Sequence, residues 1–202
     1  TGPAGPSIFP STALAARLNA KIGENVYVRF GVFNAQAGDP GDTAGVDFSF
    51  DGGLILIAEA GIEGPTRLAV GAWRYTERQE DIRETDGLGN PLQRTAQGFH
   101  VMGEQRLFGD GEGRTGTGFL RYGISEGRTT PFKASLSAGV LITAVWPGRP
   151  DSAFSVGVVR GELSSGYLLN QIGGGVNSGA SETIIEMTYS DALTSRITVQ
   201  PD

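Results

Sequence analysis

The sequence predicts an all-β protein, an antiparallel up-and-down transmembrane β-barrel, of which it supplies about ten strands. Three observations lead to this prediction. Apolar and polar residues alternate along many short segments, as they do in strands with two different faces. Thirty-two glycines are dispersed through the 202 residues, about twice the usual share. The connections between the segments are short and long in turn, as in barrels that have turns at one end and loops at the other.

Residues 53–75 predict a β-hairpin, because two apolar runs flank the Glu-Gly-Pro-Thr turn of residues 63–66. In the first run Leu54 and Leu56 fall on one face, and Glu59 falls on the other. A carboxylate at mid-strand needs water or a partner. Two interpretations stay open at this point: a half-solvated strand in a soluble sheet, or a barrel wall with lipid on the Leu54 side and water on the Glu59 side.

The remaining chain supplies further strands and longer connections over residues 35–52, 78–97, 126–132 and 163–179. Turn signals at Asp86-Gly87 and at Gly89-Asn90-Pro91 make the polar residues 78–97 a predicted loop. The loop lengths predict that residues 81–96 are extracellular and that residues 63–66 are periplasmic. A loop is also predicted over residues 163–179. Strands are predicted over residues 11–20, which are also rich enough in Ala and Leu for a helix, and over residues 25–34, 98–108, 116–125, 133–146, 152–162, 180–189 and 195–200.

Many of these predicted strands carry a single ionic side chain on the face opposite to their apolar residues. On a barrel wall they would face water, where they could contact solute. They could also simply pair with one another across neighbouring strands. The candidate pore-lining residues are Tyr27, Arg29, Glu59, Glu104, Arg106, Arg121 and Glu186.

Composition argues against several other functions. The net charge of −6 argues against a nucleic-acid partner, and no run of residues is long enough for a transmembrane helix. The chain has no cysteine, and His100 is its one histidine, so we expect no metal site, no cofactor and no histidine-based catalysis. Two of Glu59, Glu104 and Glu186 could in principle form a glycosidase pair, but inward carboxylates are ordinary in such barrels and no catalytic residue is expected. The sequence starts without Met and without a visible signal peptide, which suggests a processed or cut N-terminus.

Aromatic residues near the predicted strand ends have two possible roles. They could belong to the aromatic girdles at the membrane interfaces, or they could pack across neighbouring strands. These residues are Trp73, Tyr75, Tyr122, Trp146 and Tyr189.

Several segments resemble, in order and spacing, the OprB-type carbohydrate-selective porins of Gram-negative outer membranes. The resemblance rests on FPSTALAARL with ENVYVRFGVFNAQAGDPGD, GLILIAEAGI with RLAVGAWRY, GFHVMGEQRLF with GFLRYGIS, SLSAGVLITAVWPGRPDSAFSVGVV, and ETIIEMTYSDALTSRITVQPD. Together these cover nearly the whole chain. The family's preceding half and its closing strands have no counterpart here. Residues 1–202 therefore resemble a single barrel region, roughly the C-terminal half of the family, incomplete at both ends.

The resemblance implies an outer-membrane porin for passive, sugar-selective diffusion of small carbohydrates, with an eyelet rich in charged side chains. It implies small carbohydrates and outer-membrane lipid as partners, and a monomer or a homo-trimer as the oligomeric state. It implies no enzymatic activity. The sequence leaves two alternatives open, namely a soluble β-sandwich carbohydrate-binding module and an outer-membrane barrel enzyme.

Overall fold

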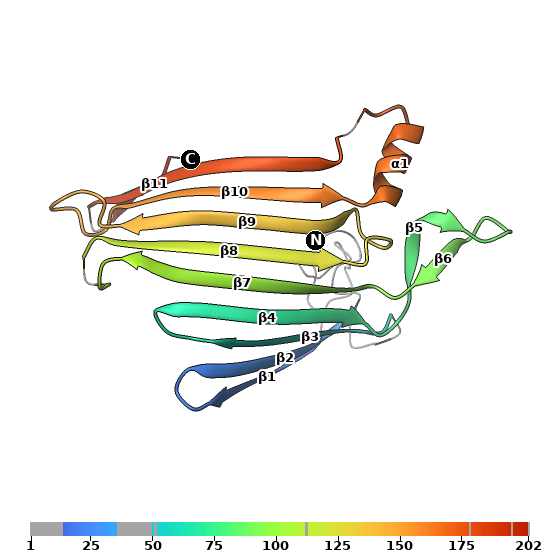
Figure 1. Ribbon diagram of the computed structural model, residues 1–202, viewed down its shortest axis with the longest axis horizontal. Helices are drawn as coiled ribbons and strands as arrows, with labels where there is room; N and C mark the ends of the chain where they lie inside the picture. Colours follow the sequence, from blue (N-terminus) through green and yellow to red (C-terminus); the bar gives the residue numbers. More distant parts are fainter. Residues whose placement is uncertain are drawn as a thin grey trace.

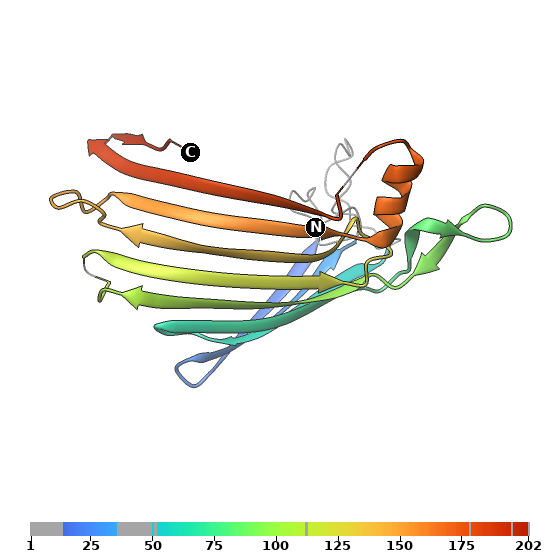
Figure 2. The ribbon, with the colours of Figure 1, turned by 45° about the horizontal axis from the view of Figure 1, so that its top comes forward.

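The computed structural model describes residues 14–35, 50, 52–111, 113–177, 179–194 and 196–201. Ten strands form one antiparallel sheet in the order β1-β2-β3-β4-β7-β8-β9-β10-β11-β12, and β5 and β6 form a separate two-stranded sheet (Figure 1). The large sheet is a single curved layer that stays open between β1 and β12 (Figure 2). The described strands thus make part of a barrel wall and not the two packed layers of a sandwich.

The strands of the large sheet pair in the order in which they follow one another along the chain, with β5 and β6 inserted between β4 and β7 and a helix between β10 and β11. The elements are β1 (Ala15–Ile22), β2 (Val26–Asn34), β3 (Leu54–Ile62), β4 (Thr66–Tyr75), β5 (Gln79–Thr85), β6 (Pro91–Arg94), β7 (Gln97–Phe108), β8 (Thr115–Ser125), β9 (Phe132–Thr143), β10 (Ala153–Leu163), α1 (Ser165–Gly173), β11 (Ser181–Thr194) and β12 (Ile197–Val199).

The three longest connections, β2–β3, β4–β7 and β10–β11, lie at one end of the sheet, but the predicted alternation fails once, because the six-residue β8–β9 connection at that end is shorter than the nine-residue β9–β10 connection at the other (Figure 1). Most of the predicted connection over residues 35–52 lies outside the described residues. Three of the connections at this end are also bonded to each other. The backbone N–H of Ile82 donates to the Arg128 carbonyl at 2.9 Å, and that of Ser164 donates to the Pro131 carbonyl at 2.7 Å. The Asn170 side-chain amide donates to the Ile82 carbonyl at 2.7 Å. The end with the long connections is therefore a connected rim.

The prediction that residues 78–97 are a loop is wrong, because this stretch folds into the β5–β6 hairpin. The predicted turn at its tip is present, since an Asp86 carboxylate oxygen accepts from the backbone N–H groups of Leu88 and Asn90 at 2.8 and 2.9 Å. At its base, the buried Asp81 carboxylate accepts from the backbone N–H groups of residues 83 and 84 and from Arg94. Burial alone would raise the pKa of Asp81, but these three donors together lower it below its ordinary value.

The prediction of a loop over residues 163–179 is also wrong in part, because Ser165–Gly173 forms α1. Ser164 caps this helix, and its hydroxyl accepts from the Tyr167 backbone N–H at 3.3 Å. The helix ends at a run of three glycines, which suits a helix C-terminus. Within the described part of the chain, no helix has the length and apolarity needed to cross a membrane.

Other strand predictions hold with shifted ends. The first strand begins at Ala15, and residues 11–13 of its predicted span lie outside the described residues. The strand predicted to reach Trp146 stops at Thr143. The last predicted strand is the short β12, which pairs with β11.

One face of the large sheet is an exposed apolar surface. Its side chains come from every second residue of the strands, and each strand from β1 to β4 and from β7 to β11 contributes. An apolar surface of this extent on a sheet is typical of lipid contact. Members of this outer face include Leu18, Val28, Phe30, Ile62, Val70, Val101, Leu120, Leu136, Val156, Ile185 and Met187.

The opposite, inner face carries a small apolar cluster near the rim. Ile55, Tyr75 and Ala96 are buried there, and Trp73 packs against them. The rings of Trp73 and Tyr75 meet edge to face, with centroids 6.2 Å apart. Both rings stand on β4, where Tyr75 lies opposite Ile55 of the neighbouring β3, so these two residues pack on the inner face and take no part in an outer girdle.

Candidate functional site

The pairing register places all seven candidate residues on the inner face. Arg29 lies directly opposite Glu59, Glu59 opposite Gly71, Gly71 opposite His100, and His100 opposite Gly123. Because side chains alternate between faces, every second residue from these positions shares their face. That set contains Tyr27, Arg29, Glu59, Glu104, Arg106, Arg121 and, through β9 and β10, Glu186.

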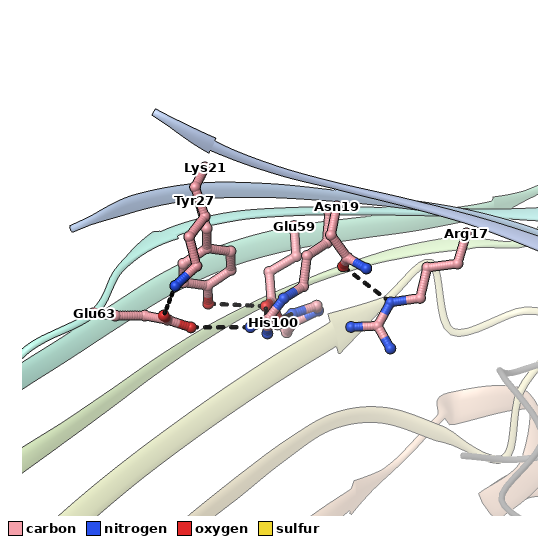
Figure 3. A network of polar contacts seen from close by, with 8 residues as sticks. Arg17, Asn19, Lys21, Tyr27, Glu59, Glu63 and His100 are labelled. Carbon is pink, nitrogen blue, oxygen red and sulfur yellow. Dashed lines mark hydrogen bonds and ion pairs between the residues drawn. The ribbon is translucent and has the colours of Figure 1, made fainter. Parts of the chain in front are cut away.

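Glu59 is the centre of a polar network on this face (Figure 3). One of its carboxylate oxygens accepts from the Tyr27 hydroxyl at 2.9 Å and from an Arg29 guanidinium nitrogen at 3.3 Å. The other oxygen contacts Nε2 of His100 at 3.2 Å. Both oxygens of this carboxylate are therefore engaged by protein donors.

The network continues toward the short-turn end of β1 to β3. A second guanidinium nitrogen of Arg29 pairs with Glu63 at 3.0 Å, and Lys21 Nζ lies 3.7 Å from the same carboxylate. The Arg29 guanidinium also lies 4.1 Å from the centre of the Tyr27 ring, within the range of a cation–π contact. Two carboxylates thus meet the cations Lys21 and Arg29, and the His100 imidazole adds a further contact to Glu59.

Glycine makes the contact between His100 and Glu59 possible. The two residues stand on β7 and β3, and Gly71 of β4 lies between them. A Cβ atom at position 71 would lie 2.5 Å from Nε2 of His100 and 2.9 Å from the Ala58 carbonyl oxygen. The imidazole ring therefore occupies the space that any side chain at Gly71 would fill.

Residues 1–202 match the family described as "Carbohydrate-selective porin, OprB family". The chain belongs to the OprB family. The family and the barrel fold place it in the outer membrane of a Gram-negative bacterium, and the family is one of transport channels.

A solved structure shows the same fold. It is the high-pH structure of Pseudomonas putida OprB, to which this chain is similar with a TM-score of 0.75 and 20% sequence identity. The match covers 92% of this chain and 51% of the P. putida chain, so this chain spans about half the length of that porin. A search of curated protein sequences gives no significant match.

Four of the candidate residues lie apart from the Glu59 network in this OprB-family chain. Arg121 of β8 lies 5.4 Å from the centre of the Phe119 ring. Arg106 donates to the Asp110 carbonyl at 2.9 Å, and Glu186 accepts from the Thr188 hydroxyl at 3.3 Å. Among the described residues, neither these three nor Glu104 forms an ion pair with another side chain.

The three glutamates proposed as a possible glycosidase pair are widely separated. Glu104 is four residues along β7 from His100, which lies in the row of Glu59, and this alone spaces them by about 13 Å along the strand direction. Catalytic carboxylates lie within about 10 Å of each other. Glu186 stands on β11, still farther across the sheet. The described residues also contain no group of three or more side chains suited to hold a metal ion.

Sequence reasoning missed several members of the network. It considered His100 only as a possible metal-binding or catalytic residue, and it left Lys21 outside the predicted strands. The sequence of β1 does indicate that Lys21 belongs to the inner face, because the polar residues Arg17, Asn19 and Lys21 occupy every second position of this strand. Figure 3 shows Arg17 and Asn19 beside the network, with a hydrogen bond of 3.1 Å between them.

Proposed function

We propose that this chain forms one continuous region of the wall of an outer-membrane channel for passive, sugar-selective diffusion of small carbohydrates. The path is lined by Tyr27, Arg29, Glu59, Glu104, Arg106, Arg121 and Glu186. The observation that carries the proposal is the division of one sheet into an exposed apolar face and a face with the Arg29–Glu59–Glu63 network. A face of this kind in a membrane has to meet water.

The charges on the inner face suit a neutral, hydroxyl-rich solute. Three arginines and three glutamates occur among the candidate residues, so their charges balance. Guanidinium groups donate hydrogen bonds to hydroxyl oxygens, and carboxylates accept from hydroxyl protons. A sugar can therefore exchange its bonds to water for bonds to the wall, whereas a wall with both signs of charge gives no strong overall preference to either kind of ion.

Liposome swelling tests the role of the arginines. The closed barrel that contains these strands is reconstituted with Arg29→Ala or Arg121→Ala, and the uptake of a neutral monosaccharide and the reversal potential in a salt gradient are measured. Loss of a fixed positive charge beside the path should change sugar uptake and shift ion selectivity toward cations. Arg160→Ala is the matched control, because Arg160 is exposed on the outer face of β10, opposite Leu136.

The control should behave as the wild type. Unchanged sugar uptake and unchanged selectivity in both Arg29→Ala and Arg121→Ala would reduce these residues to structural charges of the wall, and the lining proposal would be abandoned.

A further inference from the structure

We infer that a hollow beside the Glu59 network is a sugar-binding subsite, in which one sugar ring packs on Trp73 and bonds through a hydroxyl to His100. This inference rests on the proposed function and adds a place of recognition that lies outside the charged candidate residues. Its probe ligands are neutral mono- and disaccharides.

The hollow has the size and lining of a small-ligand site. Its volume is about 420 Å³, within the usual range for such sites. It lies between Trp73 and His100 on one side and Ser135 and Glu182 on the other, with Lys133 toward the rim. Most of the lining is apolar, with hydroxyl groups and charges of both signs among it, a combination that suits the C–H faces and the hydroxyls of an uncharged sugar better than an ion.

Small residues form the floor of the hollow. In the row that begins at His100, the directly opposed residues of β8 to β11 are Gly123, Ser135, Gly161 and Glu182. Gly123 and Ser135 carry no large side chain, so the hollow is open beside the imidazole, whereas the Phe132 ring lies over Gly161, where a Cβ atom would be 2.7 Å from it. Four strand spacings separate the ends of this row, about 19 Å along the wall, and the Phe132 ring occupies part of that length.

Trp73 and His100 are held in place before any ligand arrives. Trp73 lies directly opposite Gly98, and a Cβ atom at Gly98 would lie 2.6 Å from the indole nitrogen. The indole therefore lies over one glycine, as the imidazole lies over Gly71. Tyr75 also meets the indole edge to face. Two rings fixed on neighbouring strands lose little freedom on binding, which favours affinity.

His100 has hydrogen-bonding capacity that the Glu59 contact leaves unused. Because Glu59 is a carboxylate and accepts at Nε2, the neutral imidazole carries its proton there and leaves Nδ1 as an acceptor. Within the described part of the chain, the one hydrogen bond of the His100 side chain is that to Glu59. Nδ1 can therefore accept from a sugar hydroxyl while Glu59 keeps the tautomer and the ring orientation.

The ring of Trp73 supplies the second element of recognition. An indole offers a large apolar surface with little conformational entropy to lose, and such side chains dominate the affinity of many binding sites. The C–H surface of a sugar ring is apolar and can pack on it, while the hydroxyls at the ring edge point to His100 and to Ser135.

The test is block of ion current by glucose and by sucrose in the reconstituted, closed barrel that contains these strands. Trp73→Ala should raise the half-blocking concentration by about five- to tenfold. His100→Gln should raise it by about two- to tenfold, the effect of one lost or weakened hydrogen bond. Trp146→Ala is the matched control, because Trp146 is the chain's other tryptophan, is exposed, and lies outside the hollow. It should leave the half-blocking concentration unchanged.

Only variants with wild-type open-channel conductance are compared, so that a folding defect is not counted as a loss of binding. If Trp73→Ala fails to insert, Trp73→Phe keeps an aromatic ring over Gly98 with less surface and should raise the half-blocking concentration by about two- to threefold. Unchanged block in both the Trp73 and the His100 variants would overturn the inference of a subsite without contradicting the proposed channel function. Absence of any sugar permeation in the wild type would overturn the proposed function itself.

Discussion

Replacement of Gly71 by alanine should separate His100 from Glu59 without touching either side chain chemically. The added methyl would lie 2.5 Å from Nε2 of His100 and 2.9 Å from the Ala58 carbonyl oxygen. Carbon atoms pack at about 3.5 Å, so the imidazole must retreat by roughly 1 Å. The contact of Nε2 with Glu59 is already 3.2 Å long and would then exceed the range of a hydrogen bond.

The expected loss of stability is about 1 kcal/mol. A hydrogen bond to a charged group contributes about 1.5–3 kcal/mol, and the partial exposure of the His100 and Glu59 side chains, 34% and 18%, lowers this toward about 1–2 kcal/mol. Alanine in place of glycine restricts the unfolded chain, which stabilises the folded protein by about 0.4–1 kcal/mol. The close approach to the Ala58 carbonyl oxygen, which side-chain rotation cannot relieve, adds to the loss.

Gly123→Ala is the matched control, because Gly123 lies opposite His100 on its other side. A Cβ atom there meets its nearest neighbour, the Ser135 hydroxyl, at 3.6 Å, an ordinary contact. It should be neutral or stabilising by up to about 1 kcal/mol. The assay is urea unfolding of the closed barrel in lipid vesicles, with each variant also made in a His100→Ala background. Equal stabilities of Gly71→Ala and Gly123→Ala would refute the position of the imidazole over Gly71.

Three further predictions concern the membrane orientation, the two faces and the rim. A cysteine at Leu88, which is 89% exposed, should react with a membrane-impermeant thiol reagent in intact cells, and a cysteine at Gly64 should not; the reverse result would invert the orientation. Val101→Arg on the outer face should destabilise the barrel by about 2–4 kcal/mol in vesicles. Leu141→Arg on the inner face should destabilise it far less, although the two side chains are similarly exposed at 48% and 42%. Equal losses of stability would contradict the assignment of faces. Because the folded pKa of Asp81 is lowered, its contribution to the β5–β6 hairpin is complete above about pH 4 and is lost as the pH falls through that lowered pKa. Amide exchange in the hairpin, corrected for intrinsic rates, should therefore accelerate on acidification in the wild type and show no such step in Asp81→Asn, and identical pH profiles would argue against the prediction.

The alternation of apolar and polar residues was sufficient to predict the long strands and to assign their residues to two faces. In a strand the side-chain period is two, so a single ionic residue such as Arg29 or Arg121 fixes which set of residues avoids lipid. A shift by one residue would expose that charge to the membrane, which makes the pattern strict in the sequence. The register then follows from short turns, which leave little freedom to the next strand.

The rim could not be predicted in the same way, because its elements are held by local polar contacts instead of by an apolar period. The β5–β6 hairpin depends on Asp81 and Asp86, whose carboxylates bind backbone N–H groups within four residues. Helix α1 had signals in a serine cap and in Leu168, Leu169 and Ile172 at helical spacing. The glycines that follow concealed them, since the whole segment has the composition of a loop.

The centre of the site depends on a relation among three strands. His100 and Glu59 each lie opposite the apolar residues of their own strand, which places both on one face. Their contact also requires the register of β3, β4 and β7 and the absence of a side chain at Gly71. No local pattern in the sequence carries that relation. It becomes visible only when the strands are aligned.

Cysteine accessibility from within the channel tests the central claim most directly, because Leu120 and Arg121 are neighbours on opposite faces of β8. Each is replaced by cysteine in a cysteine-free background, and a charged, water-soluble thiol reagent is added to the reconstituted barrel while single-channel current is recorded. We predict that the reagent changes the current of Arg121→Cys, that sugar slows this reaction, and that Leu120→Cys stays unmodified. Reaction of Leu120→Cys with a change in current, and none of Arg121→Cys, would contradict the assignment of the inner face as the wall of a sugar path.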